Sequence, residues 1–314
     1  MKKSNFLSRH KKIGYIIGNY QLYLLLLPCL IALIMFHYVP MYGLWIAFTE
    51  YVPGIPIFQN EFVGFANFSI VFADPEFLLM IRNSLVISGL RLVFVFTSTI
   101  GLTLLINELC CLPFKRVFQT ISYLPHFISW VIISGMAMTF LSTDSGILNQ
   151  IIVAFGGEPI SWYSDPGKWW GILTITSWWK IVGWGTIVYL STLTTIDPQL
   201  YEAAQIDGAN RWQQTCKITI PGLSSMISIQ LILAVGKIFQ DDFDQIYSLV
   251  GGIPALSSTT EVIATKIFTI VTAGGNYKLF GTSTAMGLFQ GVISLILILI
   301  SNFVAKKRGH EGIM

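Results

Sequence analysis

Six apolar stretches, each about long enough to cross a bilayer as a helix, constrain the fold of this chain more than any other feature. A helix that spans the hydrocarbon core of a membrane needs about 20 mostly apolar residues. A soluble domain carries roughly 25% charged residues, whereas only 11% of the 314 residues here are charged and 54% are hydrophobic. The sequence therefore predicts an all-α integral membrane protein with six transmembrane helices. The stretches cover residues 22–48, 79–106, 117–140, 169–193, 226–243 and 281–304.

The basic residues that flank these stretches indicate how the chain is oriented. If the stretches alternate in direction, the clusters of Lys and Arg in the flanking segments all fall on one side, which is the cytoplasm because Lys-rich and Arg-rich loops stay there. Both termini are then cytoplasmic, with an N-terminal segment (1–20), a membrane domain (21–305) and a tail (306–314). The basic residues are Lys2, Lys3, Arg9, Lys11, Lys12, Lys115, Arg116, Arg211, Lys217, Lys306, Lys307 and Arg308.

Other interpretations of the apolar stretches are less consistent with the sequence. The first stretch is longer than the 7–15-residue apolar core of a cleaved signal peptide, so we expect it to be a retained span. The four cysteines show no paired C-x-x-C spacing, and neither a metal site nor a disulfide framework is predicted. The net charge is only +3, and no nucleic-acid partner is predicted. Residues 260–273 are largely apolar but too short to cross, so we expect them at the outer surface or packed under the bundle.

The connector between the fourth and fifth stretches, residues 196–222, is unusually elaborate for a membrane protein. Asp197 and Pro198 predict the start of a helix, and Gly208 can take the positive φ that ends one. A second helical stretch, residues 210–218, is predicted to stop before Pro221. Two short helices joined at a glycine would form a compact docking element for another protein. From the residues alone, the alternative is an amphipathic linker that lies in the membrane interface.

This connector resembles the EAA loop of permease subunits in binding-protein-dependent ABC importers. The resemblance rests on Glu202-Ala203-Ala204, Asp207-Gly208-Ala209, Ile218 and Pro221. Further segments are similar to sugar permeases of the maltose-uptake type, and in particular to permeases of complex-oligosaccharide and polysaccharide systems. The resemblance covers about residues 20–305, and the further segments are 62–68, 74–77, 83–85, 123–125, 146–149 and 243–247.

The resemblance implies a type I ABC importer permease fold in the bacterial inner membrane. It also implies several partners: a second permease, expected to be a paralogue, two cytoplasmic ATPase subunits, an extracytoplasmic solute-binding protein and a saccharide. The EAA loop would be the coupling helix that docks on the ATPase. By resemblance, the docking residues are Glu202, Ala203, Ala204, Asp207, Gly208, Ala209, Ile218 and Pro221.

The chain has no phosphate-binding loop of its own. Gly-Lys pairs at residues 167–168 and 236–237 are followed by Trp169 and Ile238, so neither completes the motif G-x-x-x-x-G-K-[ST]. We therefore expect no cofactor in this chain, with ATP and Mg²⁺ bound by the partner ATPase. The chain is predicted to be a transport subunit and not an enzyme.

Polar and aromatic residues within the spans predict a path for the substrate. Lys180 is about 12 residues, or about 18 Å, into its span, and a charge there is a functional-site hypothesis by default. Aromatic rings can stack on sugar faces. The alternatives are a tryptophan belt at the membrane interface, pairing of Arg91 and Lys237 within the bundle, and a satisfied bundle histidine at position 126. The candidate path is Tyr123, His126, Trp178, Trp179, Lys180, Trp184, Lys237, Asp241, Asp242 and Asp244.

The first functional hypothesis is a permease that imports an oligosaccharide as one half of a transmembrane pair. The alternative is a non-transporting membrane scaffold or sensor that recruits a cytoplasmic partner through the same docking element. A membrane enzyme is a third class, but no Ser/His/Asp set, carboxylate pair or metal cluster supports it.

Overall fold

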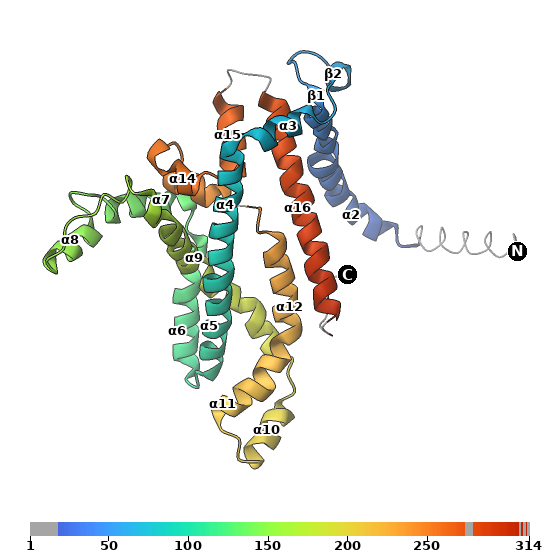
Figure 1. Ribbon diagram of the computed structural model, residues 1–314. Helices are drawn as coiled ribbons and strands as arrows, with labels where there is room; N and C mark the ends of the chain where they lie inside the picture. Colours follow the sequence, from blue (N-terminus) through green and yellow to red (C-terminus); the bar gives the residue numbers. More distant parts are fainter. Residues whose placement is uncertain (1–17, 241, 274–278, 308, 310–311, 313–314) are drawn as a thin grey trace, which may run out of the picture.

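The protein is an elongated bundle of helices in the computed structural model, which describes residues 18–240, 242–273, 279–307, 309 and 312 (Figure 1). The short helices α3 and α15 lie at one end of the bundle, here called the α15 end. Helices α10 and α11 lie at the other, here called the α10 end. Most of the predicted N-terminal segment (1–20) and much of the predicted tail (306–314) fall outside the described residues, as does Asp241.

The first and last predicted spans form long helices. The first combines α2 (Tyr20–Leu33), a π turn η1 (Ile34–Tyr38) and a 3₁₀ stretch η2 (Val39–Phe48) into a segment of 29 residues. The last is α16 (Leu279–Lys307), also of 29 residues. Helix α16 packs against η2, α12, α15 and α3, which makes it the support for the first span.

The second predicted span forms a 34-residue helix. It combines α4 (Pro75–Leu90), a π turn η4 (Arg91–Phe96) and α5 (Thr97–Glu108). Asp74 caps its start by accepting a hydrogen bond from the backbone N–H of Glu76 at 2.9 Å, and Pro75 occupies the first turn, where a missing N–H costs nothing.

The third predicted span, residues 117–140, is broken by a sharp bend. Helix α6 (Leu112–Tyr123) leads through a 3₁₀ turn η5 (Leu124–Phe127) to α7 (Trp130–Phe140), at a bend of 96°. Pro125 lacks the N–H that a continuing helix needs. Ser129 then caps α7 by accepting a hydrogen bond from the N–H of Ile132 at 3.3 Å. A proline followed by a serine cap explains the break.

The fourth predicted span is α9 (Trp169–Leu193), a helix of 25 residues. In the described part of the chain, four helices are long and apolar enough to cross a membrane, or five if the bent pair counts as one, and α9 is not among them. Its Trp, Thr and Ser residues and Lys180 reduce its hydropathy. Because α9 packs against α4, α5, α6 and α12, less of its surface faces lipid than in an outer helix, and it needs fewer apolar residues. The number of six spans stays a prediction, as does the cytoplasmic placement of both termini.

The fifth predicted span, residues 226–243, has the wrong boundaries. A continuous helix of 26 residues begins earlier, with α11 (Arg211–Gln214), a π turn η7 (Thr215–Thr219) and α12 (Ile220–Gly236). The second docking helix therefore does not stop before Pro221. Pro221 lies in the first turn of α12, directly after the widened π turn. The span also ends at Gly236, and the chain leaves the helix before α13 (Phe243–Val250).

Short elements join the long helices, and among them β1, β2, α3 and α15 lie at the α15 end (Figure 1). The short elements are β1 (Thr49–Glu50) paired antiparallel with β2 (Glu61–Phe62), η3 (Ile57–Gln59), α3 (Ala66–Ala73), α8 (Ile147–Ala154), η6 (Pro166–Lys168), η8 (Pro254–Leu256), α14 (Ser257–Thr260) and α15 (Ile263–Ala273). Asn67 fixes α3 to the first span, since its amide donates to the carbonyls of Ala47 and Thr49 at 3.0 and 3.1 Å. Gly281 faces this amide, where a Cβ would meet it at 2.6 Å. As expected for residues 260–273, α15 is too short to span a membrane.

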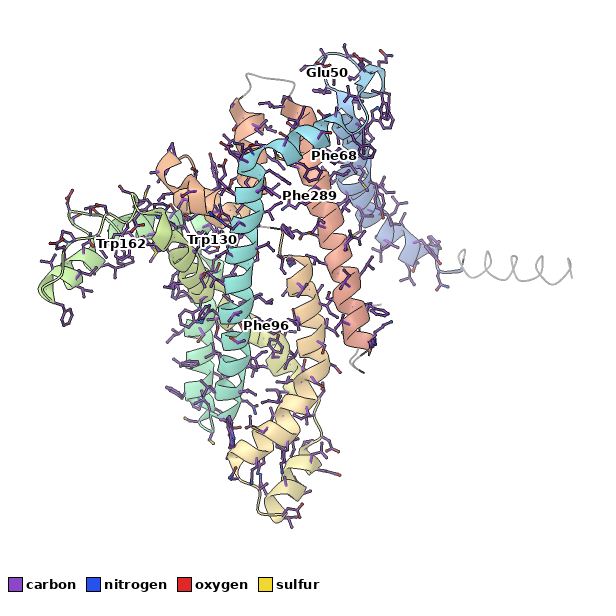
Figure 2. All side chains as sticks on the ribbon, in the orientation of Figure 1. Glu50, Phe68, Phe96, Trp130, Trp162 and Phe289 are labelled. Atoms are coloured by element: carbon purple, nitrogen blue, oxygen red, sulfur yellow. The ribbon has the colours of Figure 1, made fainter. Side chains whose placement is uncertain are left out.

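Two apolar clusters hold the bundle together. One joins α4, α7, α9 and α13 through residues that include Ile87, Trp169 and Ile246. The other joins η2, α3, α4 and α16, and the rings of Phe68 and Phe289 pack against it (Figure 2). The apolar side chains that remain exposed elsewhere are those expected of a surface that faces lipid or another subunit.

Candidate functional site

The predicted docking element occupies the α10 end of the molecule, apart from the bundle (Figure 1). Helix α10 (Pro198–Ile206) begins where the sequence predicted. The Asp197 carboxylate accepts a hydrogen bond from the N–H of Gln199 at 2.9 Å, and Pro198 fills the first turn. The cap satisfies one of the N–H groups in the first turn that have no partner within the helix, and so stabilises the start of α10.

A Schellman motif ends α10 and accounts for three of the predicted docking residues. Gly208 has φ of +77°. The N–H of Ala209 donates to the carbonyl of Ala204 at 2.8 Å, and the N–H of Gly208 donates to the carbonyl of Gln205 at 3.1 Å. This is the paired 6→1 and 5→2 pattern in which glycine is strongly preferred. The glycine therefore sets the angle between α10 and α11.

The second helix of the docking element is tied to both α10 and the span that follows. Asn210 and Gln213 form a reciprocal capping box with hydrogen bonds of 2.8 and 2.9 Å. The buried Gln214 amide donates to the carbonyl of Ala209 at 2.9 Å. The hydroxyls of Tyr201 and Thr219 lie 3.0 Å apart. Because α11 continues into α12, a push on the docking element would be carried directly into the fifth span.

The docking element exposes apolar side chains to its surroundings. Ile206 is 87% exposed and Trp212 is 73% exposed. Exposed large apolar groups at the end of a capped knob indicate a protein-binding surface. Among the predicted docking residues, Glu202, Ala203, Asp207, Gly208 and Pro221 are exposed, whereas Ala204, Ala209 and Ile218 are partly buried.

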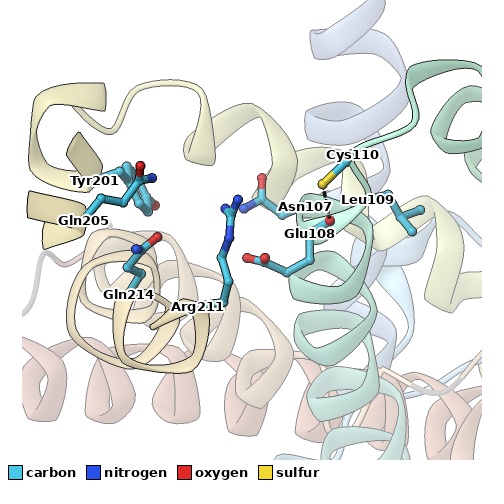
Figure 3. A pocket seen from close by; sticks show the side chains of 8 residues that line it. All are labelled: Asn107, Glu108, Leu109, Cys110, Tyr201, Gln205, Arg211 and Gln214. Carbon is cyan, nitrogen blue, oxygen red and sulfur yellow. Dashed lines mark hydrogen bonds between the residues drawn. The ribbon is translucent and has the colours of Figure 1, made fainter. Parts of the chain in front are cut away.

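A polar cavity of about 250 Å³ separates the docking element from the end of α5. Figure 3 shows Arg211 of α11 and Glu108 of α5 entering it from opposite walls. The space leaves room for the docking element to move relative to α5. The cavity is lined by Asn107, Glu108, Leu109, Cys110, Tyr201, Gln205, Arg211 and Gln214.

Lys180, the central residue of the predicted substrate path, is 9% exposed and points into the bundle. Its ammonium donates to the carbonyl of His126 at 2.9 Å and to the carbonyl of Ile128. It also lies 5.2 Å from the centre of the Trp130 ring. The structure thus places Lys180 at the break between α6 and α7.

The aromatic residues of the predicted path lie on two sides of α9. The His126 and Trp184 rings stack at 4.3 Å, with 2° between their planes. The Tyr123 hydroxyl lies 3.5 Å from that of Thr186. Trp178 and Trp179 are 43% and 37% exposed, so they point away from the buried Lys180 side chain. The structure brings together the histidine, the lysine and one tryptophan, and separates the other two.

The charged path residues after α12 surround a non-helical segment. Lys237 ends α12 and is exposed, as is Asp244. Asp242 caps α13 by accepting from the N–H of Gln245 at 3.3 Å. Within the described residues, no group of three or more His, Cys, Asp or Glu side chains could hold a metal ion.

Sequence analysis missed Gln245, which is fully buried at the centre of the bundle. Its amide donates to the carbonyl of Leu173 at 2.7 Å and to the hydroxyl of Thr176 at 2.8 Å, and its carbonyl oxygen accepts from Ser177 at 2.7 Å and from Arg91. Arg91 therefore pairs within the bundle, as one of the alternatives proposed. The feature of the sequence that could have indicated this buried amide is a single glutamine on the otherwise apolar face of α13.

Sequence analysis also missed the role of Asn149, which organises the loop between α7 and α9. Its amide donates to the carbonyls of Ser142, Thr143 and Ile160, and its oxygen accepts from the N–H of Ile160 and the indole of Trp162, at 2.9 to 3.3 Å.

Nearby, a hydrogen bond from Lys168 holds the pKa of the Asp165 carboxyl below its usual value.

We expect Asn149→Leu to loosen this loop, because five hydrogen bonds disappear and several buried backbone groups lose their partners, at about 1–3 kcal/mol each. Asn149→Asp keeps the two acceptor bonds but turns a second carboxylate oxygen toward the three carbonyls that the amide binds, so it should loosen the loop as well. Hydrogen exchange of residues 141–165 would measure both. Gln150→Leu, on the exposed side of the same helix, is the control, and equal protection in Asn149→Leu and this control would contradict the assignment.

Comparison with known proteins assigns the family. Over residues 98–309, the chain matches the family described as binding-protein-dependent transport system inner membrane component. The chain belongs to this family. The permease is 40% identical to the polygalacturonan/rhamnogalacturonan transport system permease protein YteP of Bacillus subtilis (strain 168), over 97% of this chain and 94% of that protein. It is 38% identical to Protein LplB of the same organism, over 93% and 90% of the two chains.

Solved structures show the same fold. The permease is 35% identical to a chain in the crystal structure of a bacterial ABC transporter involved in the import of the acidic polysaccharide alginate, with a TM-score of 0.84 and coverage of 95% and 99% of the two chains. A bacterial alginate ABC transporter in complex with an alginate pentasaccharide-bound periplasmic protein matches with a TM-score of 0.86, at 35% identity and coverage of 96% and 99%.

These matches confirm several predictions from the sequence. The permease is a multi-pass protein of the bacterial inner membrane with the fold of an ABC importer permease. It is a transport subunit and not an enzyme, and ATP hydrolysis belongs to separate subunits. The roles of the individual docking and path residues stay predictions.

Proposed function

We propose that this permease is one of two transmembrane subunits of an ATP-driven importer that takes up an oligosaccharide derived from an acidic polysaccharide. The proposal is carried by the docking element at the α10 end, a rigid knob with exposed Ile206 and Trp212 that continues directly into a membrane span. Such a knob is suited to receive motion from a partner and pass it to the bundle.

The substrate class is supported by the names of the relatives. YteP is a permease for polygalacturonan and rhamnogalacturonan, and the matching crystal structures concern alginate. All of these polymers contain uronate sugars. Aromatic rings such as the exposed Trp178 and Trp179 offer flat apolar faces for sugar rings.

In the proposed cycle, a solute-binding protein delivers the oligosaccharide at the α15 end and two ATPase subunits bind at the α10 end. ATP and Mg²⁺ are held by the ATPases. ATP binds the closed ATPase dimer better than the open one, and this difference in affinity biases the whole assembly between outward and inward access. The second transmembrane subunit is a paralogous permease.

The test is uptake into proteoliposomes that contain this permease, its partner permease and the ATPases, with the binding protein added outside. We expect ATP-dependent uptake of oligogalacturonides or alginate oligosaccharides, detected by mass spectrometry of the lumen. An assembly with an ATPase that cannot hydrolyse ATP is the control. Uptake that persists with this ATPase would contradict the proposal. A complex that binds the ATPase and the oligosaccharide without any uptake would favour the scaffold or sensor.

A further inference from the structure

The chain is interrupted at two places inside the bundle, and both interruptions leave backbone carbonyls without a helical partner. The first is the bend of the third span between α6 and α7, at residues 124–129, and the second follows the end of α12, at residues 237–240. In a membrane, each such group needs a partner from within the protein, because lipid offers none.

At the second interruption, polar side chains from neighbouring spans supply these partners. The Ser88 hydroxyl of α4 donates to the carbonyl of Ile238 at 2.7 Å, and the Gln290 amide of α16 donates to the carbonyl of Phe239. Both donors are neutral. This interruption is therefore closed without a charge.

At the first interruption, the donor is charged. The Lys180 ammonium donates to the carbonyl of His126, within η5, and to that of Ile128, which directly follows η5 at the bend. The carbonyl end of a helix carries a partial negative charge, which a cation stabilises. The site is buried, so this attraction is screened less than on a surface. The Trp130 ring lies against the ammonium from α7.

Lys180 belongs to a polar stripe on α9 that contacts the first interruption and α13. Thr176 and Ser177 lie one turn before it and bind Gln245 of α13. Helix α9 thus supports both the bent third span and the helix that follows the second interruption.

We propose that Lys180 is a positioning residue that holds the broken third span against α9, and that it does not bind the substrate. Two of the three N–H donors of the ammonium are used by the break, and the Trp130 ring lies 5.2 Å from Nζ. The functional part of this proposal rests on the proposed transport activity, but its structural part can be measured without transport.

The experiment compares Lys180→Met, Lys180→Gln and Lys180→Arg in the full complex in nanodiscs. Spin labels are placed at Val131 on α7 and Ile175 on α9, because both side chains are exposed. The four native cysteines are replaced first, since they are exposed as well and would also be labelled. Without substrate, we expect Lys180→Met to broaden the distribution of distances between the labels. Lys180→Arg should restore a narrow distribution, and Lys180→Gln should be intermediate because it keeps donors and loses the charge. The control is Lys168→Met, at the start of α9.

Uptake kinetics provide the second readout. Two unpartnered buried carbonyls should lower the maximal rate of Lys180→Met by about tenfold, while KM stays within about twofold. A raised KM with an unchanged maximal rate and unchanged label distances would overturn the proposal and make Lys180 a substrate ligand. If Lys180→Met does not assemble, the same comparison between Lys180→Gln and Lys180→Arg decides. If no saccharide is transported at all, the proposed function fails, and the label distances still test the role of Lys180.

Discussion

Gly208→Val is expected to reduce uptake by more than tenfold while the permease remains inserted in the membrane. Gly208 has φ of +77° in the Schellman motif that ends α10. An L-residue in this conformation costs roughly 1–2 kcal/mol, and a β-branched residue is a clear outlier there. About 1.4 kcal/mol changes an equilibrium tenfold, so most molecules would leave the native angle between α10 and α11. In these molecules the docking element would no longer fit the ATPase.

A graded series separates this backbone effect from simple crowding. No atom lies within 4 Å of a Cβ placed at Gly208, so a small side chain meets no obstacle. We therefore expect Gly208→Asn to be nearly normal, since asparagine tolerates positive φ, with Gly208→Ala intermediate and Gly208→Val worst. Uptake and substrate-stimulated ATP hydrolysis in proteoliposomes measure the series. Gly291→Ala is the control, because this glycine lies within α16 and also has open space around it. Equal activity of the Asn and Val variants would show that the conformation of Gly208 is not important for coupling.

The docking element was the part of this protein that the sequence predicted best, because its structure is encoded locally. The cap at Asp197 and the positive φ at Gly208 depend on residues within one turn of each other. Both are confirmed. The predicted end of the second helix before Pro221 is wrong, because the proline rule describes a regular helix. A π turn at Thr215–Thr219 changes the hydrogen-bond pattern just where the proline enters.

The interruptions in the spans could not be predicted from hydropathy, which measures composition and not backbone path. Pro125 was visible in the sequence, yet prolines also occur inside continuous spans, as Pro28 does in α2. What makes the break stable is the distant Lys180, 54 residues from His126. The depth of this lysine in its span and the tryptophans beside it were the features that predicted a substrate contact.

The same limit applies to Gln245, whose partners are far away in the sequence. We expect Gln245→Leu to destabilise the permease by about 3 kcal/mol. Leucine fills a similar volume but removes four contacts, with Leu173, Thr176, Ser177 and Arg91. Hydrogen bonds between helices in membranes average about 0.6 kcal/mol and reach about 1.7. Four of them therefore give roughly 2–4 kcal/mol, with the bond from the charged Arg91 at the upper end.

The loss should reach transport as well as stability, because Gln245 joins α13 to α9 at Thr176 and Ser177, one turn before Lys180. Unfolding of the purified complex in denaturant measures the change in the free energy of unfolding. Uptake at low temperature, where the variant stays folded, measures the change in transport. Gln150→Leu is the control, since Gln150 is exposed and its side chain makes one hydrogen bond, to the carbonyl of Ser145. This substitution should change the free energy of unfolding by no more than about 0.5 kcal/mol. If Gln245→Leu unfolds at the same denaturant concentration as this control, the buried amide contributes no net stability. The polar stripe of α9 would then be supported by apolar packing alone, and Lys180 would have to hold the bent third span without help from α13.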